Sequence, residues 1–485
     1  MKKLLPLAVL IASTVWFAAC GSSNSNGLPS VNGGGNNGYS SASLAGTWVF
    51  TIRGSDYTGD VFSAIGVFTA DGNGKITGGL QDVSDLAYGF SQQIPFTGGY
   101  AVNSDGRGQA QFNYSGNNGS TQIRFVFTSS GAGRIIELSN SEDATGQLFK
   151  QDSAAIAGLG ASTYVLRLDG YASNGRLADV GRLAANNGAL TFTYDENYNG
   201  ATNTGSQLTG SYTVGSNGRG TATLGSRSFV FYIVSSSDVE FMEANSSTAS
   251  GSAELQGSSF STAALTGNYV FGVSGVAGAN TNYLAVNEAG RATLDGAGSV
   301  TSGVRDFNQN GNLSNNSPVG SYTVDSGTGH FTLVLTNGSG GVYDSFTGYL
   351  INNGWGVMLT NAGPIASGTI RQQAANPSTA TLNGYYGLQF SGVNWNTGYN
   401  LEWVSSIKFD GAGNLTGTAD YTTGGTLSPN VDVNGTYNLD ANGRGTATIN
   451  SIPYVIYDVD NTQAFILSTD STRQYQGNMV LQPAD

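Results

Sequence analysis

Cysteine and histidine are almost absent from this chain of 485 residues, which has one of each, Cys20 and His330. A single cysteine excludes a disulfide framework, so packing and hydrogen bonds must stabilise the folded part. A zinc site with several histidine or cysteine ligands is excluded as well. A Ser-His-Asp triad would have to use His330, and no Gly-x-Ser-x-Gly motif accompanies it. We therefore expect no metal, no cofactor and no enzyme activity.

Charged residues are also scarce, at 11% of the chain, about half the usual share. The 19 lysines and arginines are outnumbered by 32 acidic residues, and the formal net charge is −13. Nucleic-acid binding requires basic patches that neutralise phosphates, and the sequence shows no such patch. The composition therefore excludes nucleic acid as a partner, and it is common among secreted and cell-surface β proteins.

The amino-terminal residues have the pattern of an export signal. Two lysines precede the apolar run Leu4–Phe17, which is too short to span a bilayer. The following Ala18-Ala19-Cys20 resembles the bacterial lipobox, with Phe17 where leucine is usual. This resemblance implies cleavage before Cys20 and attachment of diacylglycerol to its sulfur. A plain secretory signal is the alternative.

Acyl chains on Cys20 would anchor the protein in a membrane, because each buried methylene contributes about 0.8 kcal/mol. The next residue is glycine, rather than the aspartate that retains many such lipoproteins at the inner membrane. We expect the protein to be located at the outer membrane or the cell surface, facing the periplasm or the exterior. The segment Ser22–Ser43 is rich in Gly, Ser and Asn and predicts a flexible tether. We expect a signal peptide at residues 1–19, and lipidated Cys20 with its linker at residues 20–43.

The remainder of the chain is rich in glycine and repeats itself. Four Gly-x-Tyr motifs recur at intervals of about 110 residues, near the commonest domain size. Each unit closes on a glycine with a glutamine soon after, and the heptapeptide NGRGTAT occurs at both Asn217–Thr223 and Asn442–Thr448. The repeats predict four β domains, at residues 44–152, 153–260, 261–375 and 376–485.

Alternation of apolar and polar residues predicts strands throughout these units. Trp48, Phe50 and Ile52 share one face, for example, and no convincing helical period appears outside the leader. Each unit holds about eight such strands joined by short glycine turns, which predicts an antiparallel meander. Closure of the sheet would remove its edges. We expect all-β, tandem eight-stranded up-and-down barrels, with β-sandwiches as the alternative. The segment Ser228–Ser235 is apolar on both faces and is expected to lie against a neighbouring domain.

The opening Gly46-Thr47-Trp48 resembles the first strand of lipocalins and of the avidin family, both of which are eight-stranded meander barrels. The lipocalin resemblance implies that Trp48 plugs the closed end of the barrel. It also implies a covering basic side chain, for which Lys150 and Arg371 are the candidates in the first and third units. The whole chain resembles large secreted bacterial lipoproteins built from glycine-rich repeats.

Two glycine-rich stretches resemble functional loops but are interpreted as hairpin turns. NGRGTAT lacks the helix and the Gly-Lys-Ser/Thr that a phosphate-binding loop requires. Thr69–Gly79 resembles the centre of an EF-hand loop, but Thr69 and Leu80 stand where acidic ligands are required. His330 is interpreted as a surface strand residue in the position that Gln109, Thr221 and Thr446 occupy in sister units.

Two sets of residues are candidate ligand contacts. Asp82, Asp306 and Asp420 recur at equivalent positions, with Asp195 in the second unit. Such an aspartate either satisfies turn amides or contacts a ligand or calcium at a barrel mouth. The other set, Trp395, Tyr399 and Trp403, could stack on sugars or pack on its own barrel.

These observations favour a non-enzymatic, surface-anchored lipoprotein with a binding or adhesion role. Its expected partners are the membrane, through the lipid anchor, and a glycan or a cell-surface protein. The alternatives are a lipocalin-like carrier of small apolar ligands and a glycan-binding or glycan-hydrolysing envelope protein. Hydrolysis would require two carboxylates about 5–10 Å apart in a cleft.

Overall fold

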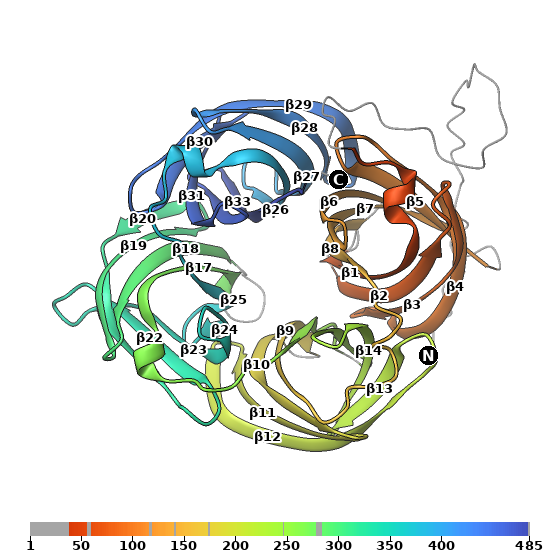
Figure 1. The fold of residues 1–485 in the computed structure, drawn as a ribbon, viewed down its shortest axis with the longest axis horizontal. Helices are drawn as coiled ribbons and strands as arrows, with labels where there is room; N and C mark the ends of the chain where they lie inside the picture. Colours follow the sequence, from red (N-terminus) through yellow and green to blue (C-terminus); the bar gives the residue numbers. More distant parts are fainter. Residues whose placement is uncertain are drawn as a thin grey trace, which may run out of the picture.

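The computed structural model describes residues 38–55, 60–115, 119–139, 142–172, 175–245, 247–277 and 284–483. Cys20, the expected signal peptide and most of the linker lie outside the described residues. The chain forms four antiparallel β-barrels that stand side by side in a ring (Figure 1). Three short 3-10 turns precede barrels 1, 3 and 4: η1 (Ser41–Leu44), η2 (Thr262–Ala264) and η3 (Thr379–Thr381). Within the described ranges, no helix has the length and apolarity needed to cross a membrane.

Barrels 1 and 2 are each closed by pairing of their first and last strands. The strands of barrel 1 are β1 (Gly46–Ser55), β2 (Val61–Ala70), β3 (Lys75–Asp85), β4 (Gly89–Val102), β5 (Arg107–Tyr114), β6 (Ser120–Ser129), β7 (Ala132–Ser139) and β8 (Glu142–Lys150). Those of barrel 2 are β9 (Thr163–Ala172), β10 (Gly175–Asn186), β11 (Ala189–Tyr198), β12 (Ala201–Val214), β13 (Arg219–Leu224), β14 (Arg227–Ser235), β15 (Asp238–Glu243) and β16 (Ser250–Leu255).

Barrels 3 and 4 repeat the same meander. The strands of barrel 3 are β17 (Thr266–Ala277), β18 (Leu284–Asp295), β19 (Ser299–Gln309), β20 (Asn312–Asn316), β21 (Val319–Val324), β22 (His330–Thr336), β23 (Val342–Asn352), β24 (Trp355–Thr360) and β25 (Ile365–Gln372). Those of barrel 4 are β26 (Asn383–Asn394), β27 (Tyr399–Asp410), β28 (Asn414–Thr423), β29 (Thr426–Leu439), β30 (Arg444–Ile449), β31 (Ile452–Asp460), β32 (Gln463–Ser468) and β33 (Arg473–Leu481).

Barrel 3 differs in one detail, because β20 and β21 together take the place of the single long fourth strand of the other barrels. The break falls at Ser317-Pro318, and proline has no N–H to donate to a sheet ladder. The four eight-stranded barrels confirm the predicted fold class, and the sandwich alternative does not apply.

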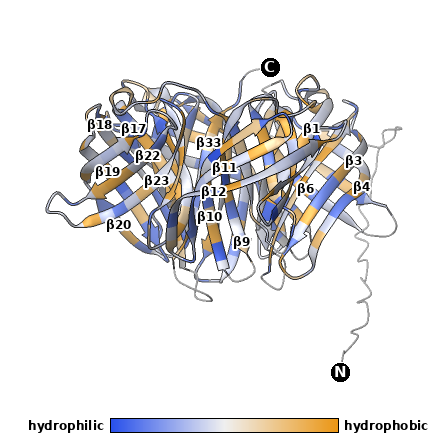
Figure 2. Ribbon diagram, turned by 90° about the horizontal axis from the view of Figure 1, so that it is seen from below, coloured by the Kyte–Doolittle hydropathy of each residue, from blue (hydrophilic) through white to orange (hydrophobic). Residues whose placement is uncertain are grey.

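The interior of each barrel is filled by its own side chains. Apolar and polar residues alternate along the strands, as the colour bands of Figure 2 show. In barrel 1 the rings of Phe96 and Phe112 stack at 4.5 Å, and Phe50 lies 5.3 Å from Phe112. Comparable buried clusters fill barrels 2, 3 and 4. Each barrel therefore has a packed core of its own.

The glycines of the four Gly-x-Tyr motifs allow close approach of neighbouring strands. A Cβ at any of them would lie 1.7–1.8 Å from a carbonyl oxygen of the paired strand: Gly98, Gly210, Gly320 and Gly435. Such a contact is impossible without separating the strands. The recurrence of this glycine therefore has a steric cause.

The lipocalin resemblance implied that a basic side chain covers the aromatic residue of the first strand. Barrel 1 has such a side chain, but barrel 3 does not. Lys150 pairs with Trp48 across β1 and β8, and its ammonium lies 6.0 Å from the indole centroid. In barrel 3 the equivalent partner of Tyr269 is Gln372, one residue beyond the expected Arg371. Because neighbouring strand residues face opposite sides, Arg371 points out of the barrel, and the expectation for it was wrong.

Apolar side chains join the barrels into the ring. Val230, Tyr232 and Val234 on the outside of β14 contact Val49 and Ile65 of barrel 1. This contact confirms that Ser228–Ser235 lies against a neighbouring domain. Similar clusters join barrel 2 to barrel 3, barrel 3 to barrel 4, and barrel 4 to barrel 1. The ring is therefore one packed body.

Candidate functional site

The recurring aspartates lie at the boundaries between barrels. Asp82 of barrel 1 is fully buried and accepts two hydrogen bonds from Arg219 of barrel 2, at 2.8 and 2.7 Å. The Tyr232 hydroxyl and the backbone N–H of Gln93 also donate to this carboxylate, at 2.8 and 3.0 Å. Protein groups thus surround the carboxylate.

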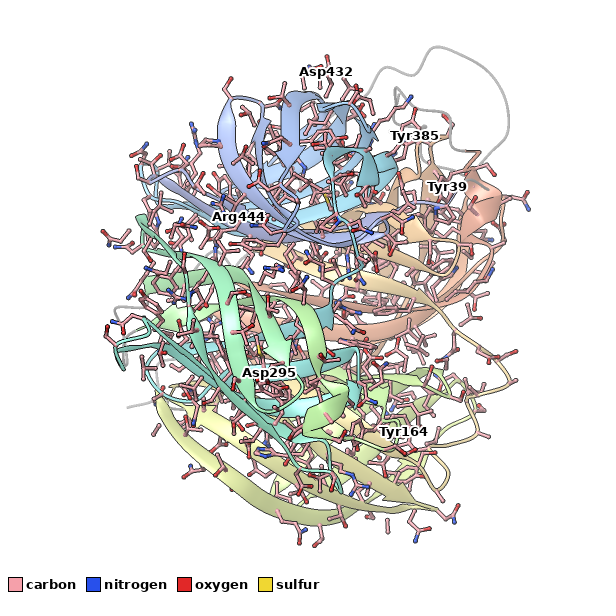
Figure 3. The ribbon with its side chains drawn as sticks, turned by 60° about the vertical axis from the view of Figure 1, so that its left-hand side comes forward. Tyr39, Tyr164, Asp295, Tyr385, Asp432 and Arg444 are labelled. Carbon is pink, nitrogen blue, oxygen red and sulfur yellow. The ribbon has the colours of Figure 1, made fainter. Side chains whose placement is uncertain are left out.

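The same pair recurs at every boundary of the ring. Its other members are Arg444 with Asp306 at 2.7 and 2.9 Å, Arg107 with Asp420 at 3.1 Å, and His330 with Asp195 at 2.8 Å. Figure 3 labels Arg444 where barrel 4 meets barrel 3. The burial and the protein partners of these aspartates favour a structural role over the ligand contact considered for Asp82, Asp306 and Asp420.

The NGRGTAT segments are hairpin turns, as predicted, but their arginines have a further role. Gly218 adopts a φ of 78° in the turn that joins β12 to β13, and Arg219 follows it. Arg219 and Arg444 are the cations of two of the boundary pairs. The heptapeptide is repeated because it supplies both the turn and the contact with the preceding barrel.

His330 belongs to this series, so its sequence alignment was wrong by two residues. It pairs with Tyr349 across the barrel wall, as Arg219 pairs with Tyr232. His330 therefore occupies the position of the arginines. Burial raises the pKa of Asp195, but hydrogen bonds from His330 and Thr347 outweigh burial and hold that pKa below its usual value.

A glutamine after the last strand of each barrel makes the reciprocal contact. Gln151 Nε2 donates to the carbonyl of Ile233 in barrel 2, at 2.8 Å. The equivalent donors are Gln256 to Leu350 at 2.8 Å, Gln373 to Asp458 at 2.6 Å, and Gln482 to Phe127 at 2.8 Å. The last of these bonds connects barrel 4 to barrel 1 and closes the ring.

The predicted aromatic cluster does not form one surface. Trp403 is buried in barrel 4 and stacks on Tyr421 at 5.3 Å. Trp395 is half-buried and its indole N–H donates to Gln474 at 3.3 Å, whereas Tyr399 is 56% exposed. Packing on the barrel therefore accounts for Trp403, and the three side chains offer no common sugar platform.

A cavity of about 400 Å³ lies between the barrels and is lined by all four of them. Most of the residues that face it come from the first two and the last two strands of the barrels. Five arginines line it: Arg53, Arg134, Arg167, Arg176 and Arg371. Two acidic residues, Asp169 and Glu254, share the lining, so the formal excess is three positive charges.

The arginines are only partly neutralised by the protein. Arg53 and Arg167 share Asp169, at 3.7 and 3.4 Å, and Arg53 also donates to the Ser250 carbonyl. Arg134 donates to Gln147 through Nη1. Among the residues that the structure describes, Arg134 Nε and Trp355 Nε1 are buried without a hydrogen-bond acceptor. Neither nitrogen is accessible to solvent, so neither of these two donors is open to the cavity.

Burial shifts the pKa values of these groups. Burial, with repulsion from Arg371, lowers the pKa of Arg134 to about 10. Burial also lowers the pKa of Arg53. Its side chain keeps 36% of its surface accessible, but the surrounding protein still reduces its solvation. Burial raises the pKa of nearby Glu240 well above its usual value, and repulsion from Asp238 and Glu254 raises it further. The arginines remain charged at neutral pH, while the neighbouring acid resists ionisation.

The sequence analysis missed this cavity. Arg53 and Arg167 alternate with the apolar core residues of β1 and β9, so their outward orientation could have been predicted. No sequence feature showed that these outward faces meet at the centre of a ring. Among the described residues, no group of three or more His, Cys, Asp or Glu is gathered to hold a metal ion.

The comparisons with known proteins give no family. No protein-family model matches the chain, and no curated protein matches it. Among solved structures, it is similar to a redesigned β-barrel, mFAP1, bound to DFHBI, at 18% identity and a TM-score of 0.17. That match covers 23% of this chain and 97% of the designed protein.

Proposed function

We propose that this protein is a non-enzymatic binding protein. The cavity between the four barrels, called the axial cavity below, would bind an anionic ligand. The observation that carries the proposal is the gathering of five of the 19 lysines and arginines around one cavity. Like charges enclosed in a low-dielectric site repel each other and lose solvation. A bound anion would relieve both costs.

The filled barrels support a site between the barrels rather than inside them. A lipocalin-like carrier needs an open apolar interior, whereas aromatic side chains occupy the barrel cores. The surface address is part of the proposal. Lipidated Cys20 and the tether at residues 20–43 would hold the ring at the outer membrane or the cell surface, where it would capture its ligand.

Calorimetry tests the binding role directly. The soluble ring, residues 20–485 with Cys20→Ser, is titrated with sulfate, glucuronate and 2-naphthoate in low and high NaCl. We expect one site per chain for at least one anion, and weaker binding at high salt. Arg167→Gln should weaken it, whereas Lys75→Gln, which removes an exposed charge far from the cavity, should not. Absence of binding by all three anions, or binding unaffected by Arg167→Gln, would contradict the proposal.

A further inference from the structure

We infer that the ligand of the axial cavity is an amphiphilic organic anion, a carboxylate or sulfonate on an aromatic or aliphatic body. This inference rests on the proposed function and names the ligand class. It is based on a comparison of equivalent positions in the four barrels, at the barrel boundaries and at the cavity. The positions at the barrel boundaries repeat, whereas those at the cavity do not.

The strand registers define the equivalent cavity positions. In each barrel, one residue of the first strand lies three positions after the opening aromatic residue. Its partners on the last strand of the four barrels are Gln147, Ser252, Thr369 and Asn478. Their partners on the preceding strand are Arg134, Glu240, Val357 and Phe465. One position thus holds a cation, an acid, an aliphatic and an aromatic residue. The boundary pairs, by contrast, keep an aspartate in all four barrels.

This variation divides the cavity into two walls. The cationic wall comes from barrels 1 and 2 and consists of Arg53, Arg134, Arg167 and Arg176. The wall from barrels 3 and 4, called the apolar wall here, holds Trp355, Val357, Phe465 and Val480 among amide and hydroxyl side chains such as Gln463, Gln476 and Asn478. Barrels 1 and 2 form one half of the ring and barrels 3 and 4 the other (Figure 1), so the two walls belong to opposite halves of the ring.

Three of the four apolar side chains of this wall keep accessible surface, whereas Val357 is buried. Phe465 lies against Gly272, where an added Cβ would lie 2.8 Å from the ring. Trp355, Phe465 and Val480 are all half-buried rather than sealed in a core. Arg371 is the one cation on this side, and its guanidinium lies over Trp355, 4.2 Å from the ring centroid.

The two walls make different demands on one ligand. Removing apolar surface from water is favourable by about 25 cal/mol per Å², so the apolar wall favours an apolar body. The cationic wall favours a negative charge, because charged hydrogen bonds are the stronger ones. A sulfate ion or an acidic sugar has no apolar body to place against Trp355, Phe465 and Val480. A neutral apolar compound leaves the excess positive charge of the cationic wall uncompensated.

The test compares four compounds by calorimetry on the soluble ring, residues 20–485 with Cys20→Ser. The compounds are 2-naphthoate, its neutral amide 2-naphthamide, sulfate and glucuronate. We expect 2-naphthoate to bind at least about tenfold more tightly than 2-naphthamide, because the amide loses a charged hydrogen bond. We also expect it to bind more tightly than sulfate and glucuronate, because these anions lack an apolar body. Arg167→Gln should weaken 2-naphthoate and sulfate alike, whereas Val480→Ser should weaken 2-naphthoate only. Lys75→Gln is the matched control, and thermal melting of each variant checks its folding.

The outcomes separate this inference from the proposed function. If sulfate or glucuronate binds as tightly as 2-naphthoate, and Val480→Ser has no effect, the ligand class is wrong and the anion site stands. If 2-naphthamide binds as tightly as 2-naphthoate, charge is irrelevant and both proposals are overturned. Absence of binding by all four compounds also overturns both.

Discussion

Arg107 offers the sharpest perturbation of the ring. Its guanidinium is fully buried between barrels 1 and 4, with Nε 2.8 Å from Asp105 and Nη1 3.1 Å from Asp420. It also donates to Asn430 Oδ1 at 3.2 Å. Barrels 1 and 4 are the first and last of the chain, so no connecting segment joins them directly. We predict that Arg107→Met opens the ring at this boundary.

The magnitude follows from the two carboxylates that the substitution would strand. Asp105 and Asp420 are 2% and 0% exposed. Breaking a buried ion pair by removing one partner costs about 3–5 kcal/mol. Asp420 keeps the N–H of Asn430 at 2.8 Å, and Asp105 keeps the backbone N–H of residue 107 at 3.0 Å, which favours the lower part of that range. The apolar cluster at this boundary, Val126, Ile136 and Val404 with Leu138, is small.

The assay combines small-angle scattering with circular dichroism and urea denaturation. Arg107→Met should increase the radius of gyration while the β spectrum stays native, because each barrel has its own core. Arg107→Met/Asp420→Asn should recover part of the loss by removing one stranded charge. Arg219→Met is the matched control, because a connecting segment keeps barrels 1 and 2 adjacent. An unchanged radius of gyration and urea midpoint for Arg107→Met would refute the reasoning.

The remaining predictions concern a buried acid, a glycine and the anchor. Burial, together with repulsion from Asp460, raises the pKa of Asp458 to about 7. The folded state therefore holds this proton more tightly than the unfolded state does. Wild-type stability should therefore fall between about pH 4 and 7, and Asp458→Asn should flatten this fall in thermal melts; parallel curves would argue against it. Gly435→Ala should lower the unfolding free energy by about 1–3 kcal/mol in urea, because its Cβ would lie 1.8 Å from the Thr448 carbonyl; an unchanged midpoint would remove the steric explanation. Cys20→Ser should abolish palmitate labelling and membrane fractionation, and a mutant that stays acylated would end the lipoprotein hypothesis.

The sequence predicted the barrels because their determinants are local. Alternation, short glycine turns and the repeated Gly-x-Tyr motif all act within one unit. The doubly apolar Ser228–Ser235 even indicated a neighbour. These features sufficed for the fold class and for the hairpin interpretation of NGRGTAT.

The ring and its cavity could not be predicted in this way. Asp82 and Arg219 are 137 residues apart, and neither residue alone indicates its partner. Recurrence showed that the aspartates share a position, but not that an arginine of the next unit fills it. The cavity arginines belong to different barrels, and only the ring brings them together. A two-residue error in the alignment of His330 also hid the fourth boundary pair.

The most direct test of the axial anion site is the crystal structure of the soluble ring soaked in selenate, with selenium located by its anomalous scattering. The arginine-lined cavity predicts a selenate ion between the barrels, within hydrogen-bond distance of at least one of Arg53, Arg134 and Arg167. Arg167→Gln crystals should show a weaker signal there. A cavity without anomalous density, in crystals that bind selenate elsewhere on the protein, would contradict the central claim.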